Sequence, residues 1–299
     1  MRALGLSALG LLFLSKAAAG QTEEVEAPNP YGASPTPEPT RDPAERPRHE
    51  PQSELFEAGA GFQLEGRWFH YTLSPANTKN IRPYDAFPVV MPWVGAQLYP
   101  AALTDLSVAK DLGITFSFAK TLGVTSSATQ DRTFSTTWNH LTFGLRYRIE
   151  TGSASMLGLS LAYGSVKVFF EPDDDKALDI AGEVASVHYE HLRLGLDARF
   201  DLGAVAIVGG LGYLANLGAG EVYNRFTDAN RGTKGDASLG AIDLSGGLSV
   251  DITTGVEARF VAEYARYFYS FDPVPGDQYI AGGALDQFLD LRLALFYVY

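Results

Sequence analysis

The chain has 299 residues, a formal net charge of −12 and no cysteine. The negative charge argues against nucleic acid as a partner, because nucleic-acid binding needs a basic surface. The absence of cysteine excludes a disulfide framework, a thiolate nucleophile and a cysteine metal site. Charged residues make up 19% of the chain, below the roughly 25% of soluble domains, which favours a body with an apolar exterior.

Residues 1–19 are predicted to be a secretory signal peptide. Arg2 gives the positive start, the apolar run Ala3–Leu14 is too short to cross a bilayer as a helix, and Ala17–Ala19 offer small residues for cleavage. No later apolar run approaches the roughly 20 residues of a membrane helix. A membrane location would therefore require a closed barrel, because only helices and closed sheets satisfy every backbone group in lipid.

Residues 20–54 are predicted to be a disordered periplasmic linker. They mix Glu, Arg, Ser and Thr with prolines, and such a composition cannot bury a core. The alternative is that the segment contacts peptidoglycan or a periplasmic partner, but no residue pattern in it favours such a contact. The prolines are Pro28, Pro30, Pro35, Pro37, Pro39, Pro43, Pro47 and Pro51.

Residues 55–299 are predicted to form one domain of about ten β-strands, because apolar and polar residues alternate with period two. Residues 289–299 show this most clearly: leucine and tyrosine occupy every second position, while Asp290 and Arg292 point the other way. The alternating segments are 56–68, 113–122, 140–149, 191–200, 242–251, 256–264 and 289–299. Segments 88–103, 156–170 and 204–215 are weaker, and Pro92 predicts an irregular position in the first of them.

Long and short connections alternate along these strands. One rim of the predicted domain would therefore carry long loops and the other tight turns. The long connections are 74–86, 124–133, 171–185, 216–236 and 272–284, and the short ones are 104–109, 150–154, 201–203 and 252–255. Outer-membrane barrels combine short periplasmic turns with longer extracellular loops in this way.

Together these features resemble the bacterial single-chain outer-membrane β-barrel proteins. The resemblance covers residues 55–299 and implies an all-β, antiparallel, up-and-down transmembrane barrel in the outer membrane. It implies contact with outer-membrane lipids, lipopolysaccharide and the barrel-assembly machinery, with the surface ligand unknown. One departure is the terminal Tyr299, where such proteins usually end on Phe or Trp.

A soluble β-sandwich or a lipocalin-like barrel is the alternative fold. About ten long strands exceed the eight-stranded lipocalin plan, and charges deep in the strands do not suit an apolar calyx. Aromatic residues near strand ends would suit the two interfacial girdles of a membrane barrel. Those assigned to the girdles are Trp68, Phe69, Tyr71, Trp138, Tyr213, Tyr264 to Tyr269, Tyr297 and Tyr299.

The inward faces of the strands are predicted to carry a polar network, concentrated in the half nearer the tight turns. In a narrow barrel opposite charges would pair and fill the interior, because an unpaired buried charge is expensive. A conducting lumen with charge-based selectivity is the alternative. The predicted network comprises Glu57, Glu65, Arg67, His140, Arg146, Arg148, His191, Arg193, Asp197, Arg199, Asp243, Asp251, Glu257, Arg259, Glu263, Asp290 and Arg292.

No catalytic, cofactor-binding or metal-binding residue is assigned from the sequence. Omptin proteases are ten-stranded barrels with acidic and Asp-His pairs near the outer rim, but His140, His191, Asp131 and Asp272 show no recurrent pairing of that kind. A Gly-x-Ser-x-Gly nucleophile motif is also lacking.

Two loops offer other candidates. Asp173–Asp175, with Glu171 before them, suit Ca²⁺ or a solvated loop tip. The 216–236 loop suits either an adhesive surface or a mobile connection, and its larger side chains are Tyr223, Arg225, Phe226, Arg231 and Lys234.

The sequence therefore predicts a non-enzymatic outer-membrane barrel with a structural or surface-interaction role. A small porin with a charged lumen is the first alternative, and an omptin-like hydrolase is the second.

Overall fold

The structure is a computed structural model, which describes residues 54–72, 83–104, 108–129, 132–172, 186–227, 236–274, 277 and 280–299. The expected signal peptide and all but the last residue of the expected linker lie outside these ranges. So do Asp131, Asp173–Asp175, Arg231 and Lys234, and the side chain of Arg225 is not described.

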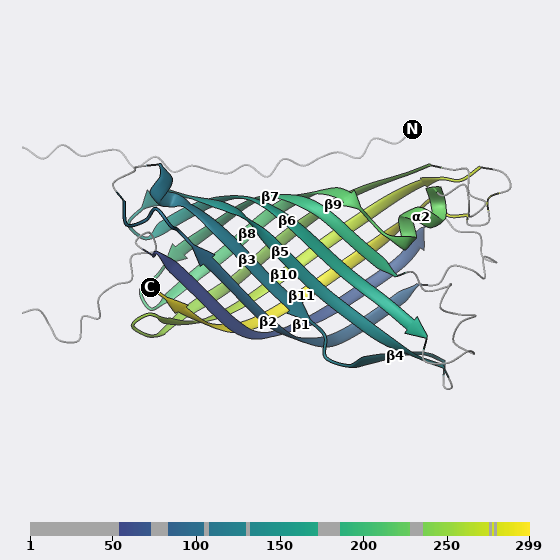
Figure 1. The fold of residues 1–299 in the computed structure, drawn as a ribbon, viewed down its shortest axis with the longest axis horizontal. Helices are drawn as coiled ribbons and strands as arrows, with labels where there is room; N and C mark the ends of the chain where they lie inside the picture. The colour runs from purple at the N-terminus through teal and green to yellow at the C-terminus, as the bar shows by residue number, and fades with distance from the viewer. Residues whose placement is uncertain are drawn as a thin grey trace, which may run out of the picture. The chain divides into compact units, whose positions relative to one another are not determined.

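The described residues form one antiparallel sheet (Figure 1). A single turn of 3-10 helix, η1 (Ala109–Asp111), precedes its third strand, and a short helix, α2 (Glu221–Thr227), follows β8. Among these residues no helix is both long and apolar enough to cross a membrane. The strands are β1 (Phe56–Thr72), β2 (Tyr84–Leu98), β3 (Leu112–Lys120), β4 (Val124–Thr129), β5 (Arg132–Gly152), β6 (Ser155–Pro172), β7 (Val187–Asp201), β8 (Val205–Gly218), β9 (Asp236–Thr253), β10 (Val256–Asp272) and β11 (Gly283–Val298).

The sheet closes into a barrel because the first strand pairs with the last. The β1–β11 register runs from Glu57 opposite Val298 to Thr72 opposite Gly283. Both β3 and β4 pair with β5, so they share one place in the wall, which therefore has ten strand positions. The predicted all-β, antiparallel, up-and-down barrel of about ten strands is confirmed.

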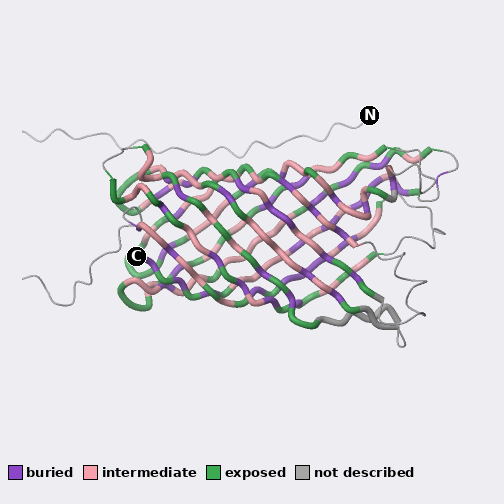
Figure 2. The backbone as a smooth tube through the Cα atoms, in the orientation of Figure 1, coloured by how far each residue is buried: buried purple, intermediate pink, exposed green. Residues whose placement is uncertain are grey.

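Side chains alternate between the two faces of the wall, so the burial of successive residues changes along the strands (Figure 2). On β11, Leu293 and Leu295 are 63% and 60% exposed, whereas Ala294 and Phe296 are 3% and 8% exposed. Exposed apolar side chains encircle the barrel: Phe62, Leu64, Val90, Val94, Ile114, Phe116, Phe118, Phe143, Leu145, Leu159, Leu161, Leu192, Leu194, Leu196, Ile207, Leu211, Ile242, Leu244, Leu248, Phe260, Leu293 and Leu295.

This apolar exterior indicates that the outer face of the barrel contacts the hydrocarbon tails of lipids. A soluble protein rarely exposes such a continuous apolar surface, whereas a barrel in lipid must. Closure leaves no unpaired sheet edge, which a bilayer does not tolerate. The chain is thus a transmembrane β-barrel, the architecture found in bacterial outer-membrane proteins.

The two rims of the barrel differ. At one rim, called the turn side, residues 153–154, 202–204 and 254–255 connect strands, and Gly203 and Gly255 supply the positive φ of 89° and 76° that tight turns need. The β2–β3 connection at this rim is longer than predicted, because β2 ends at Leu98 and η1 follows. The opposite rim is called the loop side. In outer-membrane barrels the rim with short turns faces the periplasm.

Two expected loops on the loop side contain regular structure. Most of 124–133 belongs to β4 and the start of β5, which pair as a hairpin, because β-branched Val and Thr favour strands there. Within 216–236, β8 continues to Gly218 and α2 follows. Val222 and Phe226 of α2, four residues apart on one helix face, are 0% and 1% exposed.

Candidate functional site in the barrel lumen

The lumen has three layers along the barrel axis. An ionic network lies nearest the turn side, a carboxylate–histidine cluster lies in the middle, and an aromatic layer lies nearest the loop side. Their order follows from strand direction. Along β11, for example, Phe288 belongs to the aromatic layer, Asp290 to the middle layer and Phe296 lies near the turn side.

The ionic network begins with Arg259 and Arg199, which share Glu257. The Nη2 atom of Arg259 lies 2.6 Å from Glu57 Oε2 and 2.9 Å from Glu257 Oε2. Arg199 Nη2 lies 3.0 Å from Glu257 Oε1, and its Nε donates to Asp201 at 2.9 Å. These residues come from β1, β7 and β10, so the network crosses the lumen.

Two further arginines extend the network toward the middle of the barrel. Arg146 pairs with Asp197 and donates to Gln97 Oε1 at 2.9 Å. Arg193 makes a two-pronged pair with Asp243, with both donor–acceptor distances 2.7 Å. Planar two-pronged pairs of this kind are among the strongest charge-assisted hydrogen bonds in proteins.

A cavity of about 350 Å³ lies inside this network. Its wall contains the side chains of five arginines, together with carboxylates that pair with most of them. The arginines are Arg146, Arg193, Arg199, Arg259 and Arg292. The turn-side half of the lumen is thus hollow and polar.

The aromatic layer fills the loop-side half. Tyr189 and Tyr267 stack with ring centroids 3.9 Å apart and an interplanar angle of 10°, and Trp138 lies against Phe288 at 6.4 Å. Tyr269 donates from its hydroxyl to the Tyr189 hydroxyl at 2.9 Å. Every member is at most 5% exposed: Phe69, Trp138, Tyr189, Tyr267, Tyr269 and Phe288.

Helix α2 adds a second apolar contact beyond this layer. Phe226 of α2 stacks on Phe271 of β10 with centroids 3.8 Å apart and an interplanar angle of 3°. The Tyr223 hydroxyl donates to the Ala237 carbonyl at 3.0 Å and joins α2 to β9. The proposed adhesive surface therefore lacks Phe226, because its side chain is buried inside the barrel mouth.

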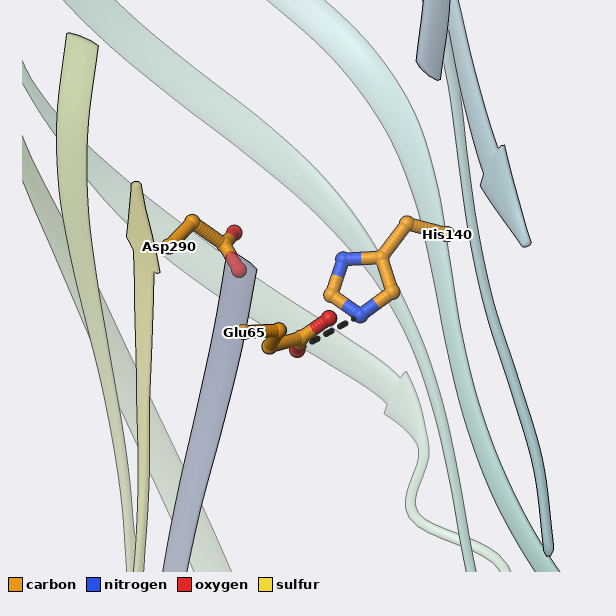
Figure 3. A group of neighbouring side chains, drawn as sticks. All are labelled: Glu65, His140 and Asp290. Carbon is orange, nitrogen blue, oxygen red and sulfur yellow. Dashed lines mark ion pairs between the residues drawn. The ribbon is translucent and has the colours of Figure 1, made fainter. Parts of the chain in front are cut away.

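The middle layer brings together Glu65 of β1, His140 of β5 and Asp290 of β11 (Figure 3). The Nε2 atom of His140 lies 2.9 Å from Glu65 Oε1, and the Glu65 side chain is fully buried. A cavity of about 70 Å³ adjoins the cluster and is also lined by His191 and Glu263.

All residues of the predicted polar network lie on the inward face of their strands. Most belong to the ionic network, whereas Glu65, His140, His191, Glu263 and Asp290 surround the middle layer. The guanidinium of Arg292 stacks over the Trp93 ring at 4.7 Å, that of Arg148 stacks over Tyr99 at 3.6 Å, and Asp251 lies at the turn-side end of β9.

The interpretation of the aromatic residues as interfacial girdles is partly wrong. Phe69, Trp138, Tyr267 and Tyr269 are buried in the lumen. Their nearness to a strand end suggested an interfacial girdle. However, successive side chains of a strand point to opposite faces, and these residues occupy the positions that point into the lumen. The residues that remain outward include Trp68, Tyr213, Phe268, Tyr297 and Tyr299.

The sequence reasoning also missed Asp286, the partner of Arg67. Asp286 has the same parity as Asp290 on β11, so alternation would have placed it inside. It precedes the clear apolar repeat that starts at Leu289, which is where the strand was recognised. Glu54, Gln97 and Tyr99 were missed as well, because they lie at strand ends.

No protein-family model matches the chain, and no curated protein matches it. Among solved structures, the outer membrane protease OmpT from Escherichia coli shares 9% identity, with a TM-score of 0.48 and coverage of 82% of this chain and 96% of that one. Neisserial surface protein A shares 9% identity, with a TM-score of 0.33 and coverage of 82% and 97%. The outer membrane protein AlkL shares 13%, with a TM-score of 0.35 and coverage of 85% and 95%.

Proposed function

We propose that this protein is a closed, non-enzymatic outer-membrane barrel that acts as a structural element and as a rigid base for surface-exposed loops. The observation that carries the proposal is the aromatic layer, which fills the loop-side half of the lumen. Six aromatic side chains from β1, β5, β7, β10 and β11 meet there, and none is more than 5% exposed.

The aromatic layer argues against the porin alternative. An ion that crossed the barrel would have to displace stacked rings such as Tyr189 and Tyr267, whose dense packing resembles a protein interior. The arginine-lined cavity on the turn side supports a polar vestibule, but it lies on one side of this layer. A conducting pore needs a continuous wet path through the lumen.

The position of the histidines argues against the hydrolase alternative. His140 and His191 line a cavity of about 70 Å³ on the turn side of the aromatic layer. Such a cavity holds a few water molecules rather than a polypeptide. General acid–base catalysis needs the catalytic group within hydrogen-bond reach of the substrate, which a surface substrate would not achieve here.

The loop side is where an interaction with other molecules would take place. Loops on a rigid scaffold can vary without disturbing the fold, so binding evolves there. Outer-membrane lipid and lipopolysaccharide surround the barrel, and we expect the barrel-assembly machinery to insert it. The net charge of −12 makes nucleic acid an unsuitable ligand.

Planar-bilayer recording tests the closed lumen. Purified, folded barrel should give no single-channel steps, and reproducible steps in the wild-type protein would contradict the proposal.

Replacement of residues 173–185 by a short Gly-Ser segment tests the display role. The barrel should keep its heat-dependent gel mobility, whereas binding to a surface ligand through that loop should be lost.

A further inference from the structure

Three strands converge on one group of potential metal ligands in the middle of the lumen. Glu65, His140 and Asp290 each offer one ligand atom, and these atoms lie within 4.8 Å of one another. Glu65 and Asp290 are direct cross-strand neighbours on β1 and β11, whereas His140 reaches in from β5 (Figure 3). The cluster therefore depends on barrel closure rather than on nearness in sequence.

Four polar atoms of this cluster lack hydrogen-bond partners among the described residues. Both carboxylate oxygens of Glu65, Nε2 of His140 and Oδ1 of Asp290 are buried without a hydrogen bond. His140 Nε2 lies 2.9 Å from Glu65 Oε1, but the direction of its ring N–H does not fit a hydrogen bond. Buried polar groups are normally satisfied, so unpaired atoms that converge on one point indicate a missing ligand.

Negative charge exceeds positive charge around this point. Asp290 lies between Glu65 on β1 and Glu263 on β10 in the strand register. The nearby Arg67 and Arg193 are bound to Asp286 and Asp243. His140 pairs with Glu65 and Arg292 lies near Asp290, so the three carboxylates exceed these two cations by one charge even when His140 is protonated. Carboxylates that face each other across strands also destabilise a sheet. A divalent cation would relieve both effects.

We propose that Glu65, His140 and Asp290 bind one divalent transition-metal ion in the middle of the barrel. One imidazole nitrogen with two carboxylate oxygens is a donor set that suits Zn²⁺. In a tetrahedral zinc site two ligand atoms lie about 3.4 Å apart, so side-chain shifts of about 1–1.5 Å complete the site. The fourth position is open to water from the adjoining cavity.

The ion reaches this site from the turn side. The small cavity beside the cluster and the larger turn-side cavity share the lining residues Thr142, Arg193 and Glu263. No passage through the aromatic layer is needed. In outer-membrane barrels the rim with short turns faces the periplasm, so the site would draw metal from there.

Metal titration of the full-length, untagged barrel tests the proposal. Folded protein is stripped of metal with EDTA and titrated with ZnCl₂ by calorimetry, and with CoCl₂ by visible absorption. We expect one ion per chain in the wild type. H140Q, E65Q and D290N should each weaken binding at least about tenfold, because loss even of groups that only orient ligands has effects of that size.

A matched control is H188Q. Outside the lumen, His188 Nε2 lies 3.8 Å from Glu190 Oε1, so it offers the same residue types without the third ligand. This variant should bind like the wild type, and heat-dependent gel mobility reports folding of each variant. The proposal is overturned if the wild type binds no stoichiometric zinc, or if H140Q binds as tightly as the wild type.

A second measurement covers the case in which the lumenal variants fail to fold. The variant H49Q/H70Q/H188Q changes no residue of the proposed site and leaves His140 and His191 as the only histidines of the five in the chain. X-ray absorption of its zinc complex should show at least one imidazole ligand. Oxygen ligands alone would overturn the assignment.

Discussion

Arg67 and Asp286 form a two-pronged ion pair inside the barrel, with Arg67 Nε and Nη2 at 2.9 and 2.8 Å from the two carboxylate oxygens. Both side chains are fully buried. They belong to β1 and β11, so the pair ties the seam at which the barrel closes. The Tyr189 hydroxyl of β7, across the lumen, donates to the same carboxylate at 2.7 Å. One carboxylate thus links the seam to the opposite wall.

Loss of either partner of this pair should strongly destabilise the barrel. R67M leaves the Asp286 carboxylate buried without its cation, and D286L leaves the guanidinium without its anion. Each should lower the free energy of unfolding by about 3–5 kcal/mol, because an uncompensated buried charge has a cost of that size. Urea unfolding in lipid vesicles, followed by tryptophan fluorescence, measures the change.

The double variant R67M/D286L supplies the control for that experiment. Because both charges of the pair are removed together and neither is left without its partner, the loss of stability should be clearly smaller than the sum of the two single losses. Additive losses would show that the two side chains are not energetically coupled, in contradiction to the observed geometry.

Removal of two rings from the aromatic layer should open the lumen. Trp138 is 0% and Phe288 2% exposed, and both face the axis. W138A/F288A replaces them with methyl groups, so water can enter, and planar bilayers should show conductance that the wild type lacks. The double variant should also lose stability, since each such truncation costs about 3–5 kcal/mol.

The matched control for this opening is F143A. Phe143 lies on the same strand as Trp138 but points outward and is 54% exposed. Its removal should leave the bilayer recordings silent. Channel steps in F143A, or their absence from a folded W138A/F288A barrel, would mean that the aromatic layer does not close the lumen.

The ionic network predicts different effects for two arginines of β10. Arg259 pairs with Glu57 and Glu257 in the lumen, whereas Arg266 is exposed. R259Q should reduce the free energy of unfolding by about 3–5 kcal/mol, because two buried carboxylates lose a cation. R266Q should change it by less than about 0.5 kcal/mol. Equal effects in vesicle unfolding would contradict the network.

Much of the fold could be predicted from the sequence because a lipid-facing strand has a strict period of two. The leucines and tyrosines after Leu289 alternate with Asp290 and Arg292, and that alternation fixes which face meets lipid. The alternation of long and short connections predicts the up-and-down topology, because each strand spans the membrane once and successive connections lie at opposite rims.

The pairing within the lumen could not be predicted from the sequence. Arg67 and Asp286 meet only because β1 and β11 are neighbours in a particular register, which alternation alone does not specify. The aromatic layer was missed because an aromatic near a strand end suits both an interface and a plug. The position of the residue in the strand alternation decides whether its ring faces lipid or the lumen. Trp138 lies two residues before His140 on β5, so both side chains point inward.

Site-directed spin labelling of β11 tests most directly the claim that the apolar face meets lipid and the charged face fills the lumen. The chain contains no cysteine, so single cysteines at Arg292, Leu293, Ala294 and Leu295 can be labelled without background. In vesicles, labels at 293 and 295 should be highly accessible to oxygen dissolved in the lipid, and labels at 292 and 294 should not. A reversed or flat pattern would contradict the barrel's orientation.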